Sequence, residues 1–271
     1  MPGWVGLQPR STAVLVRVRV AGGWWLFDGL WPVNAKGVRP RRGNMLRDRI
    51  VDQRNGVTTV SRTFNCLDEK TREVGLRSAA DAVEAGRLVV LPTDTVYGIG
   101  CNAFSPEAVN KLLQAKHRGP DMPVPVLVGS WDTVRGLSRD YTRQMNVLIE
   151  AFWPGGLSIV VHQAPSLTWN LGDTNGSVML RMPQQKLAIE LLQKTGPMAV
   201  SSANISGNPP ALNAAEAEAQ LGNSVSVYLE GGQAEIGTPS TIVDLTGATP
   251  QILREGAVPS EKVFEVLKAN S

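Results

Sequence analysis

Four segments of the sequence combine hydroxyl, cationic and glycine residues in ways that suit an anionic or polar ligand. The first is Pro-Thr-Asp-Thr-Val-Tyr-Gly-Ile-Gly at 92–100, where Thr93, Thr95 and Tyr97 offer hydroxyls. Its glycines allow backbone N–H groups to approach a bound molecule closely. An ordinary hydrogen-bonded turn, with Asp94 satisfying backbone groups, explains this segment equally well when it is taken alone.

The second segment places Lys116 and Arg118 between an expected helix and Pro120. If the chain runs extended there, residues two apart project to the same side, and the two cations form a solvent-facing clamp for phosphate. His117 then points away and is not a candidate base. The simpler alternative is that both bases only interact with the dipole at the C-terminal end of the helix.

The other two segments follow apolar strands. Ser202 and Asn204 lie in a small-residue stretch, 201–210, that exposes backbone N–H groups and suits a nucleotide or another anion. Arg181 and Arg254 each leave a strand toward a loop, where a guanidinium can bind a carboxylate or phosphate. Ser240 precedes a further strand. Turn chemistry and a salt bridge at the rim are the competing explanations for these residues.

The absence of several catalytic motifs from the sequence argues against a number of familiar enzyme classes. It contains no Walker-type phosphate loop, no HExxH, no GxSxG and no Rossmann glycine fingerprint. With Cys66 and Cys101 as the two cysteines, and His117 and His162 as the two histidines, neither a disulfide framework nor a Cys/His metal site is expected. A reducing, cytoplasmic setting follows as the expectation.

The elements that must position these loops alternate between short apolar strands and amphipathic helices. This pattern predicts an α/β domain of about 200 residues with a twisted, mixed sheet flanked by helices. The expected helices span 78–85, 105–116, 141–152, 184–194, 213–221 and 259–267, and the expected strands span 88–91, 124–128, 157–161, 178–181, 198–200, 225–229, 241–245 and 251–253.

The first 56 residues have a different composition from the rest of the 271-residue chain. They hold ten basic and three acidic side chains, a net charge of +7, so the overall charge of +3 leaves −4 for residues 57–271. Four of the seven tryptophans also lie there. We expect 1–56 to be disordered or a mis-called start, with the working protein beginning near Met45 or Val57; a transit peptide is the weaker alternative. No apolar run is long enough to predict a membrane span.

Taken together and in this order, the motifs resemble the YrdC-type family of threonylcarbamoyl-AMP synthases, in its single-domain form. The resemblance covers about 74–258, with 259–271 as a terminal helix. The motifs that carry it are Pro-Thr-Asp-Thr-Val-Tyr-Gly at 92–98, Lys-x-Arg at 116–118, Phe-Trp-Pro-Gly at 152–155, Arg-Met-Pro at 181–183, Ser-Ala-Asn-x-Ser-Gly at 202–207, Ser-Thr-Ile-Val-Asp at 240–244 and Leu-Arg-x-Gly at 253–256.

The resemblance implies a fold with a ligand groove over the sheet and a nucleotidyltransferase reaction. L-threonine, bicarbonate and ATP, with Mg²⁺ carried by the ATP, would give threonylcarbamoyl-AMP and pyrophosphate. Downstream proteins would then use the product to modify an adenosine in tRNA. By matching positions, the residues that would hold threonine are Thr95, Arg181, Ser202 and Ser240, and those that would hold ATP are Lys116, Arg118, Asn204 and Arg254. No general base is evident, so catalysis by positioning and charge stabilisation is expected.

Four positions depart from the usual family pattern and leave individual contacts open: Met122, Gly156, Ser158 and Glu255. Two other functions also remain to be weighed. A double-stranded RNA or tRNA-binding module of the same fold is disfavoured by the −4 charge of residues 57–271, because binding to a phosphate backbone relies on neutralising cations. A carbamoyltransferase-like maturation protein would need additional zinc-binding cysteines.

Overall fold

A computed structural model describes residues 16–20, 23–27 and 61–270, and its contacts divide the chain into two units, 1–45 and 46–271. In the first unit, β1 (Val16–Val20) pairs antiparallel with β2 (Gly23–Phe27), with Val18 opposite Trp25. For the other residues of 1–56, the prediction of disorder or of a mis-called start lies outside the described residues.

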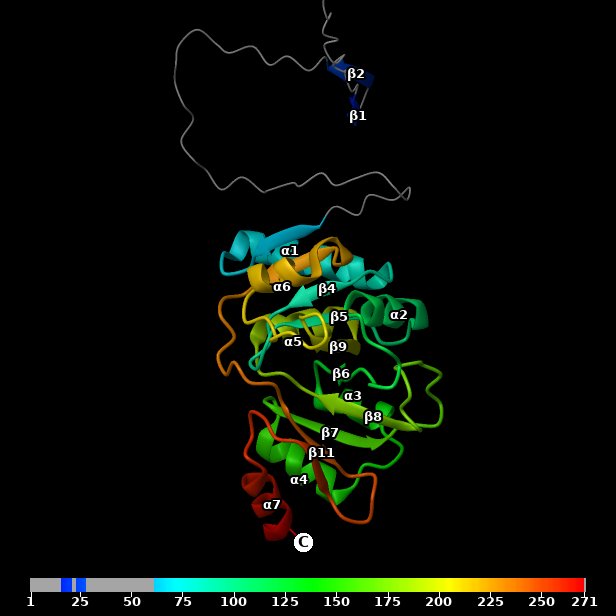
Figure 1. Ribbon diagram of the computed structural model, residues 1–271, viewed down its shortest axis with the longest axis vertical. Coiled ribbons are helices and arrows are strands. Elements are labelled where there is room, and N and C mark those ends of the chain that lie inside the picture. The colour runs from blue at the N-terminus through cyan, green and yellow to red at the C-terminus, as the bar shows by residue number, and fades with distance from the viewer. Residues whose placement is uncertain (1–15, 21–22, 28–60, 271) are drawn as a thin grey trace, which may run out of the picture. The chain divides into compact units, whose positions relative to one another are not determined.

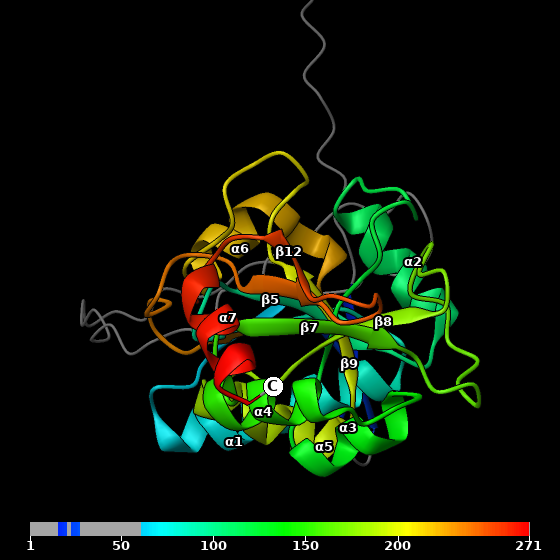
Figure 2. The same ribbon diagram turned by 90° about the horizontal axis from the view of Figure 1, so that it is seen from below.

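The second unit is built on one mixed ten-stranded sheet, which confirms the predicted fold class. Its strand order is β12-β11-β7-β8-β6-β9-β5-β4-β10-β3 (Figure 1). The strands are β3 (Arg62–Asn65), β4 (Val89–Leu91), β5 (Gly98–Asn102), β6 (Val126–Leu127), β7 (Leu157–His162), β8 (Ser177–Arg181), β9 (Met198–Ser202), β10 (Val227–Glu230), β11 (Thr241–Asp244) and β12 (Gln251–Arg254). The sheet contains both parallel pairs, such as β11 with β7, and antiparallel pairs, such as β7 with β8. The strand direction changes markedly along the sheet, so β9 crosses the direction of β7 in Figure 2.

Seven α-helices in residues 61–270 flank this sheet: α1 (Glu69–Glu84), α2 (Pro106–Ala115), α3 (Trp131–Leu137), α4 (Arg143–Phe152), α5 (Lys186–Thr195), α6 (Ala214–Leu221) and α7 (Ser260–Ala269). A short 3₁₀ turn, η1 (Gly222–Ser224), follows α6. In Figure 2, α1 and α5 lie together on one side, and α2 and α6 lie on the opposite side. None of these helices combines the length and the apolar character needed to cross a bilayer.

Local signals set most helix ends as the sequence predicts. The Ser105 side chain accepts a hydrogen bond from the Ala108 N–H at the start of α2, and Pro106 occupies the first helical position. Asn213 caps α6 in the same way. Helix α1, in contrast, begins nine residues before the predicted 78, because Asp68 caps it by accepting from two backbone N–H groups.

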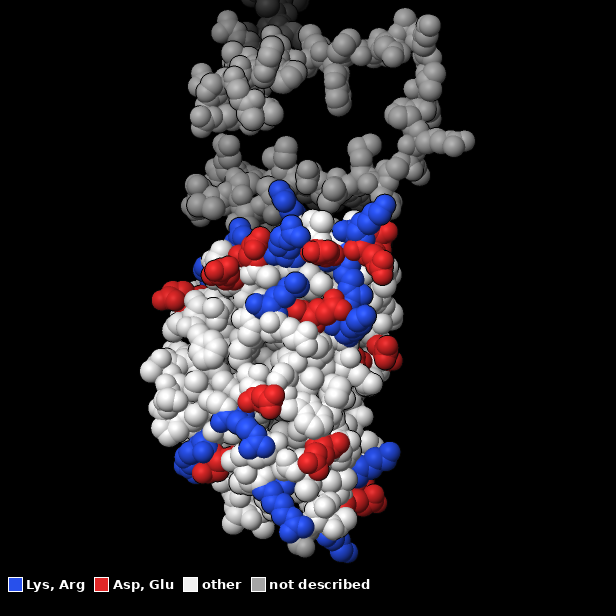
Figure 3. Space-filling model, turned by 180° about the vertical axis from the view of Figure 1, so that it is seen from behind, with Lys and Arg blue, Asp and Glu red and all other residues white. Residues whose placement is uncertain are grey.

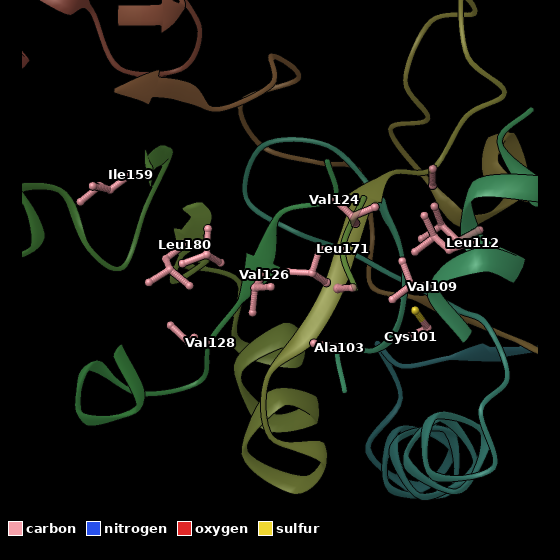
Figure 4. Packing of buried hydrophobic residues seen from close by; sticks show 14 of the residues in the cluster. Cys101, Ala103, Val109, Leu112, Val124, Val126, Val128, Ile159, Leu171 and Leu180 are labelled. Atoms are coloured by element: carbon pink, nitrogen blue, oxygen red, sulfur yellow. The ribbon is translucent and has the colours of Figure 1, made fainter. Parts of the chain in front are cut away.

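Two clusters of buried side chains hold the helices to the sheet. The larger cluster includes residues of α2, α3, α4, α6 and α7, and part of it is shown in Figure 4 around Val126 and Leu180. The smaller cluster lies between the sheet and the pair α1 and α5, around Leu76 and Leu191. Burial on both faces explains why the strands read as continuous apolar runs.

Among the strands and α-helices of residues 61–270, three were not predicted: β3, α3 and β5. The expectation of a glycine-rich turn over 92–100 was wrong at its end, because Gly98 and Gly100 belong to β5, between β4 and β9. A Cβ on Gly98 would lie 2.6 Å from Val200 Cγ1, and one on Gly100 would lie 2.9 Å from Val200 Cγ2. These glycines therefore allow close strand packing, a tertiary requirement that resembles a turn signal in the sequence.

Candidate functional site

The loops at the strand ends enclose a cavity of about 260 Å³ on one face of the sheet. Its floor is formed by apolar strand residues that include Leu127, Met179, Val200 and Ile242. Six of the eight predicted site residues line it: Thr95, Arg118, Arg181, Ser202, Ser240 and Arg254. The other two, Lys116 and Asn204, do not line the cavity; Asn204 follows β9, and Lys116 is hydrogen-bonded to it. The predicted groove over the sheet is thus present.

Arg181 is held from three directions at one end of the cavity. Its Nε donates to the Gly155 carbonyl at 2.8 Å, its Nη1 donates to Thr95 Oγ1 at 2.7 Å, and its Nη2 donates to Asp94 Oδ1 at 2.8 Å. Burial lowers the pKa of the guanidinium, and the neighbouring Asp94 carboxylate opposes that shift. Since a guanidinium has five N–H groups, one remains on each terminal nitrogen. This geometry leaves Arg181 able to bind a carboxylate.

Asp94 does more than the sequence indicated. It accepts a hydrogen bond from the Gln184 N–H at 2.9 Å, as a turn aspartate would, and it also forms a buried ion pair with Arg181. Its second oxygen, Oδ2, is buried and has no partner among the described residues. Pairing across 87 residues leaves no local signal, so sequence reasoning missed it.

The path predicted around Lys116 was wrong. Lys116 has helical dihedral angles at the end of α2, and His117 takes a left-handed φ of 52°, so the chain turns instead of running extended. Lys116 is not solvent-facing either: it is 2% exposed, and its Nζ donates to the Ser202 carbonyl at 2.5 Å and the Asn204 carbonyl at 2.7 Å. Burial, together with the charge of Arg118, lowers the pKa of Lys116 to about 8.

The remaining ATP-site candidates lie around the same loop. The Asn204 side-chain amide donates to the carbonyls of Ile205 and Asn208, which fixes the loop that Lys116 supports. Arg118 donates to Ser201 Oγ at 3.2 Å and to the Pro123 carbonyl, while its Nε is buried without a partner among the described residues. Both cations therefore contact residues 201–204, whereas the sequence predicted that they would together face solvent as a phosphate clamp.

Ser240 links Arg254 to a residue that sequence reasoning did not assign. Arg254 Nε and Nη2 donate to the Ser240 carbonyl, and Nη2 also lies 3.2 Å from Ser240 Oγ. Ser240 Oγ is 2.9 Å from Ser158 Oγ, and both serines are buried. The one signal for Ser158 was its departure from the usual family residue.

Positive charge is in excess at this cavity. Arg181 is paired with Asp94, but Lys116, Arg118 and Arg254 form no ion pair within residues 61–270. No Asp, Glu or His lines the cavity, and no cluster of three or more metal-ligating side chains occurs in the described part of the chain. A polyanion is the ligand that such a site favours. On the face in Figure 3, basic and acidic side chains alternate without a continuous basic surface.

The chain is similar to proteins of known family. A model of the Sua5/YciO/YrdC family, described as telomere recombination, matches residues 81–256. A Mycobacterium tuberculosis protein, provisionally named a threonylcarbamoyl-AMP synthase, is 59% identical over 208 residues, which are 77% of this chain and 96% of that protein. The threonylcarbamoyl-AMP synthase of Pyrococcus abyssi is 32% identical over 73% of this chain and 59% of its own length.

Solved structures agree with these matches. The crystal structure of P. abyssi Sua5 complexed with L-threonine superimposes with a TM-score of 0.69 at 32% identity, over 73% of this chain and 58% of that one. Escherichia coli YciO, at 23% identity and a TM-score of 0.64, covers 71% of this chain and 93% of its own, and it supports the fold alone.

Proposed function

The chain belongs to the Sua5/YciO/YrdC family, and from this we propose that it is a threonylcarbamoyl-AMP synthase. It forms threonylcarbamoyl-AMP and pyrophosphate from L-threonine, bicarbonate and ATP, and so acts as a nucleotidyltransferase. The observation that carries this proposal is a cavity lined by Arg181, which is paired with the buried Asp94, and by Arg118 and Arg254, with Lys116 nearby; the last three form no ion pair within residues 61–270. One end suits an amino acid, and the surplus charge suits a triphosphate.

Threonine would bind against Arg181, Thr95, Ser202 and Ser240. The two unused N–H groups of Arg181 suit the carboxylate, since a guanidinium can bind both carboxylate oxygens. The buried hydroxyls of Thr95 and Ser240 supply further hydrogen bonds. Because Arg181 is held by three other groups, little side-chain freedom is lost on binding.

ATP would bind along Arg118 and Arg254, with Lys116 and Asn204 holding the loop beside it. Lys116 also contributes a buried positive charge near the cavity. Mg²⁺ would accompany ATP as part of the substrate and would reduce the negative charge of the triphosphate. No protein ligand for the ion is assigned.

The chemistry joins an anion to a polyanion. The amine of threonine attacks the carbon of bicarbonate and water leaves, and a carbamate oxygen then attacks the α-phosphorus while pyrophosphate departs. Repulsion between the two reactants is the main obstacle, and the cations of the cavity reduce it. The lining contains no Asp, Glu or His, and burial raises the pKa of Tyr97 further above its ordinary value. Positioning and charge stabilisation therefore carry the proposed catalysis.

The direct test is pyrophosphate release from ATP, with and without L-threonine and with and without bicarbonate, together with mass detection of the adenylate. Release should require both. Arg181→Ala should abolish it, whereas Arg77→Ala, at an exposed i,i+4 pair on α1, should leave it unchanged. Release that is indifferent to threonine would contradict the proposal.

The rival RNA-binding function is not favoured, since the matched relatives are named as synthases. The resemblance covers 74–258, with 259–271 as a terminal helix, but β3 and the start of α1 lie before residue 74 and belong to the same sheet unit. We therefore propose a catalytic domain that runs from β3 through α7, with 1–56 dispensable. A chain that starts at Val57 should then keep full activity, and loss of turnover would contradict this division. The reducing cytoplasm is the proposed compartment, consistent with two free, buried cysteines. Proteins that transfer the threonylcarbamoyl group to tRNA are the proposed partners.

A further inference from the structure

Thr93 lines the cavity next to Thr95, and its hydroxyl hydrogen is donated to one specific acceptor. Thr93 Oγ1 lies 2.6 Å from the Val96 carbonyl oxygen. A carbonyl oxygen can only accept, so the single hydroxyl hydrogen of Thr93 must be donated there. Thr93 is 3% exposed, and water therefore does not compete readily for this bond.

That bond decides the direction of the next one. Thr93 Oγ1 and Thr95 Oγ1 are 3.0 Å apart, and either could in principle donate. Because the Thr93 hydrogen is already used, Thr95 must donate to Thr93. Thr95 Oγ1 also accepts from Arg181 Nη1 at 2.7 Å, and arginine is always a donor. A hydroxyl oxygen has two acceptor sites, so one acceptor site and no hydrogen remain on Thr95 for a ligand.

We propose that Thr93 is a positioning residue that fixes Thr95 as a pure hydrogen-bond acceptor for the nitrogen of the amino-acid substrate. This inference rests on the proposed function. Arg181 offers donors for the carboxylate directly beside the acceptor on Thr95, and an α-amino acid carries its carboxylate and its nitrogen in the same adjacent arrangement. The nitrogen keeps a hydrogen after carboxylation, so the bond to Thr95 persists through the reaction.

The pair Ser158 and Ser240, which also lines the cavity, shows that the hydroxyl groups of the lining are not all arranged this way. Ser240 Oγ accepts from Arg254 Nη2 and is bonded to Ser158 Oγ. Whichever serine donates within the pair, one hydroxyl hydrogen is left without an acceptor among the described residues. The serine pair thus offers a donor where Thr95 offers an acceptor.

The test compares Thr93→Val with Thr93→Ser, using L-threonine and 2,3-dihydroxybutanoate of matching configuration as ligands in calorimetry. In Thr93→Val the Thr95 hydrogen is free to turn into the cavity, where it opposes an ammonium but suits a hydroxyl. Threonine affinity should fall about tenfold, the effect of losing one hydrogen bond to a charged group. Affinity for 2,3-dihydroxybutanoate should change less than twofold. Thr93→Ser keeps the hydroxyl and should match the wild type within twofold.

If Thr93 had a merely structural role, Thr93→Val would lower the affinity for both ligands by the same factor, and that result would overturn the proposal. An unchanged threonine affinity in Thr93→Val would also overturn it. A second measurement does not depend on the folding of Thr93→Val: Thr95→Val alone should lose about tenfold in threonine affinity, and an unchanged affinity would also overturn the proposal. In the Thr95→Val background, adding Thr93→Val should cost less than twofold more, because Thr93 acts through Thr95. If the wild type shows no threonine-dependent pyrophosphate release, the proposed function fails instead.

Discussion

Replacing Asp94 by Asn removes the charge that balances Arg181 while keeping the shape of the side chain. The Asp94 and Arg181 side chains are 2% and 7% exposed, so the guanidinium would be left buried without a counter-charge. Breaking a buried ion pair from one side costs about 3–5 kcal/mol. Asparagine can still accept from Arg181 and from the Gln184 N–H, so the lower value, about 3 kcal/mol, applies. In a domain of this size that corresponds to a loss of about 6–12 °C in melting temperature.

Thermal unfolding followed by circular dichroism measures this loss directly. The matched control is Asp140→Asn, which breaks the Arg139–Asp140 pair, where both side chains are at least half exposed. Exposed pairs contribute about 0–1 kcal/mol, so this control should shift the melting temperature by no more than about 4 °C. If Asp94→Asn were no more destabilising than Asp140→Asn, Arg181 would not depend on Asp94 for its charge balance.

Two other substitutions and one pH dependence have distinct expected outcomes. Lys116→Met should lower the free energy of unfolding, measured by urea titration, by about 2–4 kcal/mol, because two carbonyls lose a charged hydrogen-bond donor. The control is Lys186→Met, at a side chain that is 81% exposed, and it should change this free energy by less than about 0.5 kcal/mol. The pKa of Lys116 is lowered to about 8 from 10.5, so between these values the unfolded chain binds the additional proton. The unfolding free energy of wild type minus that of Lys116→Met should therefore rise from pH 8 to pH 10, and a fall would contradict the assignment. Gly256→Ala would place a Cβ 2.6 Å from the Ser240 carbonyl carbon, so Ser240 would have to move. The KM for threonine should then rise at least about tenfold, which corresponds to a loss of about 1.4 kcal/mol in binding free energy. Gly247→Ala, with its nearest contact at 3.8 Å, should leave that KM unchanged.

Local features of the sequence were sufficient for most of the element order. Helix caps such as Ser105 and Asn213 act through neighbouring backbone groups, so their signals can be read along the chain. Apolar runs located most of the strands of the mixed sheet. Among the elements that were missed, β5 contains Gly98 and Gly100, whose lack of a side chain makes room for Val200 on a neighbouring strand.

The position of Lys116 shows where local reasoning failed. Its sequence context, a basic residue at the end of a helix before a glycine and a proline, is typical of an exposed cation. The structure buries it because the loop after β9 returns beside α2 and offers carbonyl oxygens from residues 86 and 88 positions away. The buried ammonium of Lys116 is stabilised by these carbonyl oxygens and in turn supports the loop. The periodicity of the helix sequence does not predict this role.

The sequence by itself determined the fold class, the loops that line the cavity and a family resemblance, because each depends on residue types in a fixed order. Tertiary structure alone decided that Arg181 is balanced by Asp94, that Ser158 bonds Ser240, and that Thr93 sets the direction of the Thr95 hydrogen bond. The first two pairs bring together residues more than 80 positions apart. The third depends on the orientation of a hydroxyl group, which residue identity does not specify.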